Sequence, residues 1–365
     1  MPDIAIIGAG IAGLHLGLWL QTHGIQPTVY AEHPPEQLRS ARLPSTAAFY
    51  GTVRAHMREL GIAHWDDPDT STRAFDFGIK DMPHFGFRVP VVPPMQFIDM
   101  RVYLPQLLAD FTSRGGTVIT SGALDAPALT RLAEGHELIV VASGRGELAS
   151  IFPRVPERSP YTTPQRRIMA GLFHGIRLPA ERCFTQRIVA SVGEICEFQL
   201  LAQGGAVSAL LIFAIPGGAL DGITHLRYED DPAAFNGAVL ALLREYAPAI
   251  CERIEDPSLF GALGPLELRQ GGIVPVVRRG VCELRPGRHA LALGDAHVTM
   301  DPLTAQGANA AAKAAHLLSG LLAAQIHNGA ALDGAFCTGV EQRLWELLQP
   351  FAEWNNAALA PPAAP

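Results

Sequence analysis

Residues 3–13 read DIAIIGAGIAG, and this stretch decides the fold. Its first five residues predict a short buried strand, and the apolar pattern that follows the glycines predicts a helix. Gly8 permits a tight turn, Gly10 lets backbone approach a pyrophosphate, and Gly13 allows close packing of helix on strand. A second predicted strand at 27–30 completes a βαβ unit. The stretch therefore predicts a Rossmann-like domain that binds phosphates at a helix N-terminus.

The acid that binds the adenosine ribose is expected about 20 residues beyond such a fingerprint. Glu32 lies 32 − 13 = 19 residues after Gly13. In the commonest form of the motif the acid stands one position earlier, where this chain has Ala31, and a slip of one residue in a strand reverses the side chain's face. Because a strand end can bend, we expect Glu32 to bind the ribose. The alternative is an ordinary solvated carboxylate.

Composition excludes several classes of protein. The 365 residues correspond to about two to three domains. Hydrophobic residues make up 48% and charged residues 17%, so the chain can bury enough surface to offset its ordering entropy. Lys and Arg number 28 against 35 Asp and Glu, a net charge of −7. This balance argues against nucleic-acid binding as the main function.

Cysteine usage and targeting signals favour a cytoplasmic protein. The five cysteines are widely spread and lack zinc-ligand spacing, so we expect neither a disulfide framework nor a metal site. The apolar N-terminus lacks a basic region and is interrupted by glycines, unlike a signal peptide. The sequence also has no uninterrupted apolar run long enough for a membrane span.

Further strands and helices follow the first βαβ unit. A helix is expected at 101–114, and strands at 117–120 and 138–142 extend the same sheet. Between about 164 and 275 the sequence becomes rich in β-formers separated by Gly and Pro. This texture predicts an antiparallel sheet with strands at 167–176, 188–192, 197–202 and 206–213 and one helix at 232–246.

The last part of the chain returns to the texture of the first domain. We expect a strand at 290–293, a long Ala-rich helix at 302–327 and one more helix from 330 onward. The predicted domains are a discontinuous dinucleotide-binding domain, an inserted substrate-binding domain, and a C-terminal helix and tail. Their boundaries are 1–45, 95–163 and 273–328 for the first, 46–94 and 164–272 for the second, and 329–365 for the third.

A second signature favours FAD over NAD. Residues 291–297 read LALGDAH and residues 301–309 read DPLTAQGAN, a pattern similar to that of FAD-dependent hydroxylases. There the Gly-Asp carboxylate holds the ribityl chain, and the next helix points its N-terminus at the N1–C2=O edge, which is anionic in reduced flavin. Pro302 costs little near a helix start. Beyond the three glycines, this pattern predicts cofactor contacts from Ala12, Gly294, Asp295, Pro302, Gly307, Ala308 and Asn309. For Asp295 alone, an Asx turn is the alternative.

The chain resembles the FAD-dependent epoxidase subunit of two-component styrene and indole monooxygenases, which are external flavoprotein monooxygenases. The resemblance rests on blocks that occur in order over most of the chain. They are 8–18, 28–30, 42–43, 101–103, 164–166, 171–176, 230–232, 270–275, 294–295 and 301–309. In that family the ribose acid is displaced by one residue as well, which supports Glu32.

The resemblance implies a fold of the GR2, p-hydroxybenzoate-hydroxylase-like type. It also implies that a separate NAD(P)H-dependent flavin reductase supplies reduced FAD, which reacts with O2 to a C4a-hydroperoxyflavin. Its distal oxygen then epoxidises or hydroxylates a small apolar aromatic alkene or an indole-like substrate. The sequence has no second dinucleotide fingerprint for a nicotinamide. Residues 142–146, ASGRG, stand where single-component hydroxylases carry Asp-Gly.

Because the oxygen transfer is the cofactor's chemistry, we expect no acid–base triad. Arg42 is the best polar candidate near the flavin, with a solvent-exposed loop arginine as the alternative. Ser45 and Gln306 complete the predicted catalytic set. Arg101 is expected to reach FAD, or else to pair with Asp99. The predicted substrate pocket is lined by Leu43, Pro44, Phe198, Leu200, Leu211 and Leu303, although each leucine and phenylalanine is also a normal core residue.

Two departures from the family leave the substrate open. The family places Arg-Leu-Leu-Asn next to the substrate, whereas this chain has Pro44 and Ser45 at the last two positions. This favours a substrate that is shaped differently from styrene or is more polar. The chain also stops at Pro365, before the further helices of the styrene enzymes, and a homodimer partner is one way to cover the substrate side.

Three rival functions stay open at this level. A flavin-dependent halogenase is disfavoured because the four tryptophans do not form the Trp-x-Trp-x-Ile-Pro segment. An N- or S-oxygenase is harder to exclude because the same flavin species oxidises heteroatoms. A non-catalytic FAD-binding protein is the rival from another class, and turnover would separate it from an oxygenase.

Overall fold

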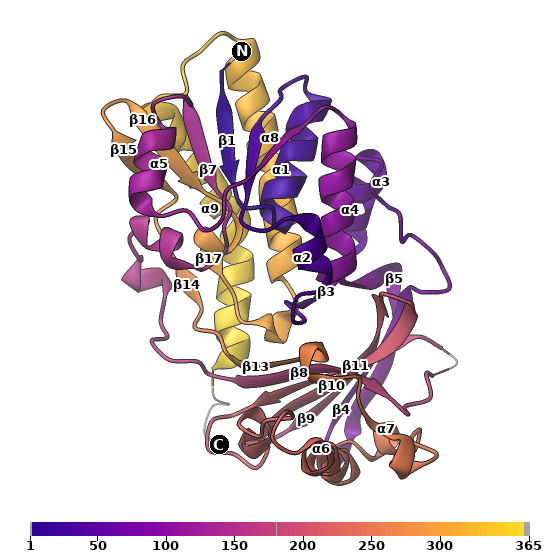
Figure 1. Cartoon of the computed structure of the whole chain (residues 1–365). Coiled ribbons are helices and arrows are strands. Elements are labelled where there is room, and N and C mark those ends of the chain that lie inside the picture. The colour runs from indigo at the N-terminus through magenta and orange to yellow at the C-terminus, as the bar shows by residue number, and fades with distance from the viewer. Residues whose placement is uncertain (1, 180, 361–365) are drawn as a thin grey trace.

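Two β-sheets divide the chain, as the computed structural model in Figure 1 shows for residues 2–179 and 181–360. One sheet is mostly parallel and flanked by helices, and the other is mostly antiparallel and lies beyond its carboxyl edge. The fold is therefore α/β, with a Rossmann-like domain, which we call the FAD-binding domain after its predicted cofactor, an antiparallel substrate-domain sheet and a C-terminal helix. The last five residues of the predicted tail, 361–365, lie outside the described residues.

The first sheet confirms the strands predicted from the sequence. Its order is β15-β16-β7-β1-β2-β6, and all neighbours except β15 and β16 run parallel. Successive residues of β1 alternate between two separate cores, which explains the unbroken apolar run. The strands are β1 (Ile4–Ile7), β2 (Thr28–Ala31), β6 (Thr117–Thr120), β7 (Leu138–Val141), β15 (Val281–Arg285) and β16 (Arg288–Ala292).

Helices cover both faces of this sheet. On one face, the large core joins Ile4 and Ile6 to residues of five helices: α1 (Ile11–Thr22), α3 (Gly51–Glu59), α4 (Met100–Ser113), α8 (Gly307–His327) and α9 (Gly334–Leu359). On the other face, Ala5 and Ile7 pack with α5 (Ala126–Leu132) and the 3-10 turn η1 (Glu147–Ile151). The short α2 (Pro35–Arg39) follows β2. No helix of the described residues is long and apolar enough to cross a membrane.

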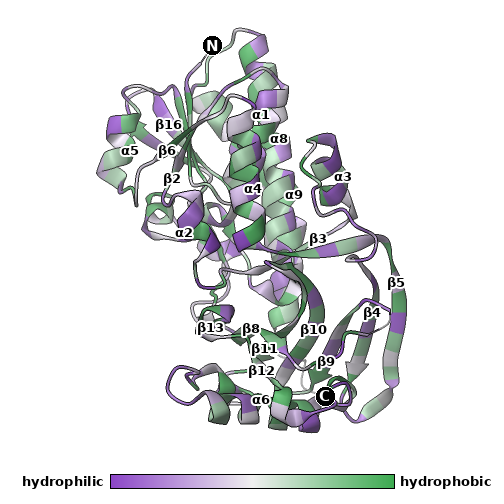
Figure 2. Cartoon of the chain, turned by 45° about the vertical axis from the view of Figure 1, so that its right-hand side comes forward, coloured by the Kyte–Doolittle hydropathy of each residue, from purple (hydrophilic) through white to green (hydrophobic). Residues whose placement is uncertain are grey.

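The second sheet has nine strands in the order β12-β8-β11-β10-β9-β4-β5-β3, with β13 also paired to β8. One face packs on α6 (Pro232–Tyr246) and α7 (Pro248–Cys251), and the other faces the FAD-binding domain. Figure 2 shows β10 and β11 as predominantly hydrophobic. The strands are β3 (Thr46–Phe49), β4 (Thr72–Ile79), β5 (Met82–Asp99), β8 (Arg167–His174), β9 (Cys183–Val189), β10 (Gly193–Ala202), β11 (Gly205–Ala214), β12 (Gly261–Ala262) and β13 (Leu268–Gly272). A separate pair joins β14 (Val276–Val277) to β17 (Val298–Thr299).

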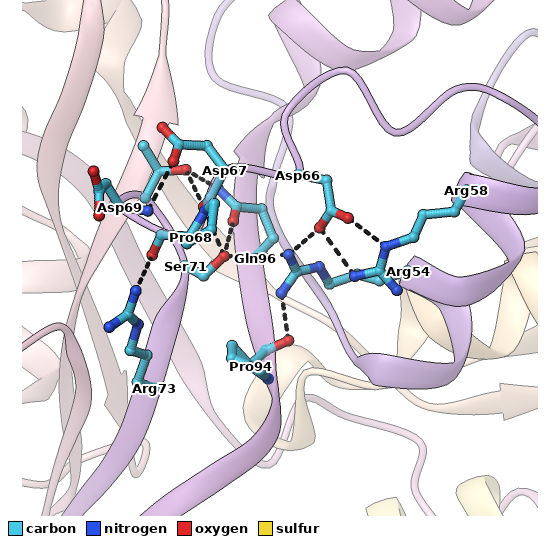
Figure 3. Close-up of polar contacts among 11 residues, drawn as sticks. Arg54, Arg58, Asp66, Asp67, Pro68, Asp69, Ser71, Arg73, Pro94 and Gln96 are labelled. Carbon is cyan, nitrogen blue, oxygen red and sulfur yellow. Dashed lines mark hydrogen bonds and ion pairs between the residues drawn. The ribbon is translucent and has the colours of Figure 1, made fainter.

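The segment between β3 and β4 joins the two domains. The predicted boundaries assign it to the substrate-binding domain, yet Val53 and Met57 of α3 lie in the core of the FAD-binding domain. Figure 3 shows how Arg54 and Arg58 of this helix both pair with Asp66 in the loop that follows. Arg54 also donates to the Pro94 carbonyl of β5, so α3 is fixed to both the loop and the sheet.

Two predicted elements were wrong in their extent. The expected strand at 188–192 belongs to β9, which begins at Cys183 and ends at Val189, because Ser191 turns the chain with a positive φ of 62°. The expected helix at 302–327 is broken. Residues 302–304 form a separate 3-10 turn, η7 (Pro302–Thr304), and Ala305 has a φ of 52°, so α8 begins only at Gly307.

Candidate active site

The turn between β1 and α1 has room for a ligand only on one side. Gly8 has a φ of 113°, and a Cβ at Gly13 would lie 2.0 Å from the Gly8 carbonyl oxygen, so both positions require glycine. A Cβ at Gly10 would meet nothing within 4 Å. Gly8 and Gly13 thus shape the turn. The open side at Gly10 leaves backbone N–H groups accessible to a pyrophosphate.

The Gly-Asp pair at the end of β16 lies against this turn. Gly294 has a φ of 63°, and a Cβ there would come within 2.9 Å of the Ala12 side chain. Among the described residues, none donates a hydrogen bond to the Asp295 carboxylate. Burial raises the pKa of Asp295, against the opposing effect of Arg145 and Arg278. This half-buried carboxylate without a hydrogen-bond donor fits a ligand hydroxyl, as the ribityl chain of FAD would supply.

The turn before α8 presents the helix N-terminus. Asp301 caps η7 by accepting from the Leu303 N–H at 2.9 Å, and Pro302 follows it. Gln306 is the N-cap residue of α8, and its side chain donates to the Thr304 carbonyl at 3.3 Å. Gly307 and Ala308 then form the first turn, where backbone N–H groups lack intrahelical partners. This arrangement suits an anionic flavin edge.

The Asn309 side chain is committed to the protein itself. Its Oδ1 accepts from the Tyr50 N–H at 2.9 Å, and its Nδ2 donates to the Ala48 and Ala305 carbonyls at 2.8 and 3.2 Å. These bonds tie the end of β3 to α8. Contact between Asn309 and FAD stays a prediction, and in this geometry it would come from the backbone of Asn309 rather than its amide.

Glu32 is free to accept a ligand. Ala31 is the last residue of β2 and is buried, whereas Glu32, one position later, is exposed. Among the described residues, the His33 ring lies beside it, with 3.5 Å between His33 Nε2 and Glu32 Oε1. Because β2 pairs with β1, Glu32 lies at the same sheet edge as the glycine turn. The ribose contact of Glu32 itself stays a prediction.

The two predicted arginines both contact the segment 265–268 of the substrate-binding domain. Arg42 donates to the Pro265 and Leu268 carbonyls at 2.6 and 3.1 Å and pairs with Glu229 at 2.8 Å. Arg101 is buried between Asp99 and Glu267. Burial disfavours its charge, but hydrogen bonds from Arg101 to Glu267 and Asp99 outweigh this and raise its pKa. The alternative pairing with Asp99 is thus present, and FAD contact by either arginine stays a prediction.

Five of the six predicted pocket residues share one apolar cluster, which we call the apolar floor. The floor includes Phe97 and Phe198, whose rings stack with centroids 4.1 Å apart. The remaining members on the sheet and around it include Leu43, Ala48, Met95, Ile168, Leu172, Cys196, Leu200, Ala209, Leu211 and Phe213, with Leu303 and Ala305 packed against them. Pro44 and Ser45 lie outside the floor and are exposed.

The sequence analysis missed three groups beside this floor. Phe97 lies on β5 and Phe184 on β9, and the two rings stack. The sequence analysis did not predict a strand at either of these two positions. At the end of the floor, Arg166 and Glu194 form a buried bidentate pair at 3.0 and 3.1 Å. In the sequence only Arg166, within the block 164–166, pointed to this pair. Its partner Glu194 could not be identified because it is distant in sequence.

The chain is similar to known flavin-dependent monooxygenases. Residues 144–253 match the family described as "Styrene monooxygenase A putative substrate binding domain". The chain is 32% identical to the styrene monooxygenase StyA of Pseudomonas fluorescens over 98% of this chain and 85% of that protein.

Two solved structures show the same fold at low sequence identity. The myxobacterial chondrochloren halogenase CndH superposes with a TM-score of 0.72 at 16% identity, covering 98% of this chain and 82% of that chain. The structure described as "pqsL, a probable FAD-dependent monooxygenase from Pseudomonas aeruginosa" gives a TM-score of 0.68 at 16% identity, covering 98% of this chain and 95% of that chain. These two likenesses concern the fold alone. The identity with StyA over almost the whole chain goes further: the chain belongs to the styrene monooxygenase family and is a two-component FAD-dependent monooxygenase.

Proposed function

We propose that this protein uses reduced FAD from a separate NAD(P)H-dependent flavin reductase, together with O2, to epoxidise or hydroxylate a small apolar aromatic alkene or an indole-like molecule. One oxygen atom enters the substrate and the other leaves as water, while reduced FAD is oxidised. The observation that carries the proposal is the position of Leu303. It belongs to the turn that precedes the flavin-facing helix, and it packs against the same apolar floor as Phe198.

Some residues would bind FAD, and others would shield the site from water. The glycine turn and Asp295 fit the pyrophosphate and the ribityl hydroxyls of FAD, which when bound and reduced supplies the activation of O2. Gly307 and Ala308 would present the N–H groups of the helix N-terminus, with their partial positive charge, to the flavin. The apolar floor, in which Phe198 and Phe97 stack and are buried, would exclude water from the side of the site that faces the substrate domain. Catalytic roles for Arg42, Ser45 and Gln306 remain proposals.

The exposed Ser45 and Pro44 bear on the substrate. They stand where the resemblance places a family leucine and asparagine, so the rim of the pocket differs here from that of the styrene enzymes. We therefore expect a substrate other than styrene, with a shape or polar group suited to this rim. The homodimer and the cytoplasmic location predicted from the sequence stay predictions.

A coupled assay tests the proposal. Purified protein is supplied with FAD, NADH, a flavin reductase and ¹⁸O₂, and products are followed by mass spectrometry over styrene, indole, aryl sulfides and arylamines. A product of an alkene or indole with one ¹⁸O atom is expected. Phe198→Ala should lower this yield, and the matched control Phe87→Ala, at a side chain 52% exposed on β5, should not. Hydrogen peroxide alone across the panel would refute the proposal, and products from sulfides or amines alone would replace it by heteroatom oxygenation.

A further inference from the structure

Asn355, near the end of α9, is fully buried and uses its amide on a distant turn. Its Oδ1 accepts from the Asp301 N–H at 3.0 Å. Its Nδ2 donates to the Asp301 carbonyl and to Thr304 Oγ1, both at 2.8 Å. Asparagine is a poor helix former, so its place inside a 26-residue helix requires these bonds as compensation. A single side chain thus holds both ends of the turn at 301–304.

The turn held by Asn355 is under strain. Ala305 follows it with φ 52° and ψ 28°, a left-handed conformation that a residue with a Cβ adopts only at a free-energy cost. Strain of this kind persists only where surrounding contacts over-determine the backbone. The bonds from Asn355, the Asp301 cap and the Asn309 bond to the Ala305 carbonyl are those contacts.

The strained turn leads directly into the N-terminus of α8. Gln306 is the N-cap residue and Gly307 the first helical residue, so a shift of the turn would move the N–H groups of the first helical turn. The remainder of α9 contributes only apolar packing at its buried positions, including Leu344 and Leu348 in the core. Figure 1 shows α9 running from the parallel sheet down toward the substrate-domain sheet, past this turn.

We propose that Asn355 is a positioning residue: through three hydrogen bonds it holds the strained turn 301–305, and so sets the orientation of the α8 N-terminus toward the flavin. The inference rests on the FAD site of the proposed function. It assigns to the C-terminal helix a part in tuning the cofactor, in addition to its part in packing. The α8 N-terminus should stabilise the negative charge of reduced flavin only while it keeps this orientation.

The test compares three variants on the same helix. Asn355→Ala removes the three bonds, Leu344→Ala opens a cavity in the core beside α9, and Asn356→Ala changes the neighbouring side chain. For each variant, oxidised FAD is titrated by fluorescence, the reduction potential of bound FAD is measured, and the unfolding midpoint is recorded. We expect Asn355→Ala to weaken FAD binding about tenfold and to lower the potential. Leu344→Ala should lower the unfolding midpoint at least as much while leaving both flavin readouts unchanged.

The outcomes separate a positioning role from a structural one. Unchanged FAD affinity and potential in Asn355→Ala would overturn the inference. Equal changes in Leu344→Ala would also overturn it, because any loosening of α9 would then suffice. If the wild-type protein itself bound no FAD, the proposed function would fail first, and that failure is visible before any variant is made.

Discussion

Asp301 provides the most quantitative prediction. Its side chain is fully buried, Oδ1 accepts one N–H bond, and Oδ2 has no hydrogen-bond partner among the described residues. Burial raises the pKa of this carboxyl from 3.8 to about 7. The Leu303 N–H, Arg166 and Arg145 act in the opposite direction, and Glu194 adds to the rise. The folded protein therefore holds a proton that the unfolded chain has already released near neutral pH.

The sign of the pH effect follows from this difference. A carboxyl whose pKa is raised in the folded state costs stability as pH rises from its unfolded pKa to its folded one. With about 1.4 kcal/mol for each pKa unit, the full cost above pH 7 is about 4 kcal/mol. Asp301→Asn keeps the oxygen that caps Leu303 but has no proton to lose. Relative to wild type, the variant should gain about 2–3 kcal/mol in free energy of unfolding between pH 5 and pH 8.

Urea unfolding of the FAD-free protein at several pH values measures this gain. The control is Asp333→Asn, an exposed cap of α9 whose carboxylate accepts from the Phe336 N–H at 2.9 Å. The difference in free energy of unfolding between Asp333→Asn and wild type should stay nearly constant from pH 5 to pH 8. Parallel curves for Asp301→Asn and wild type from pH 5 to pH 8 would refute a buried proton on Asp301.

Four further substitutions test other parts of the site. Gly13→Val should both destabilise the protein and abolish FAD binding, whereas Gly10→Ala, which has open space for its Cβ, should weaken FAD binding while the unfolding midpoint stays near wild type. Arg101→Met should cost about 3–5 kcal/mol in chemical unfolding, because it leaves the buried Asp99 without its cation. Phe198→Ala should cost about 3–5 kcal/mol through the cavity it opens, and should raise KM for an aromatic substrate in the coupled assay.

The sequence predicted the FAD half of the fold well because its signals are local. The apolar run before Gly8 and the patterns of the neighbouring strands each lie within a few consecutive residues. The predicted bounds of β6 are those of the structure. The turn at Ala305 could not be predicted in this way. An alanine signals helix, and its left-handed conformation depends on hydrogen bonds from Asn355, about 50 residues away.

The site shows the same division. Gly8, Gly13 and Gly294 were identified because only glycine fits their backbone, a constraint visible in the motif itself. The partners of Arg42 and the Glu267 partner of Arg101 lie far away in sequence, so these contacts required the tertiary structure. The pairing of Arg101 with the nearby Asp99 was the alternative predicted from the sequence. Phe97 on β5 stacks on Phe198 on β10. These strands are not consecutive in the sequence and no motif links them, so the stack could not be predicted from the sequence.

The two arginines predicted to reach FAD differ in what such a contact would require. Arg101 is buried with Asp99, which is itself fully buried, so turning toward a ligand would strand a carboxylate without water. Arg42 is 45% exposed and its partner Glu229 is 37% exposed, and surface pairs of this kind contribute little. Arg42 is therefore the arginine able to exchange Glu229, and with it the Pro265 and Leu268 carbonyls, for a flavin contact. On that reasoning, FAD should expose the 265–268 turn to proteolysis in the wild type but not in Arg42→Gln, and equal protection of both by FAD would contradict it.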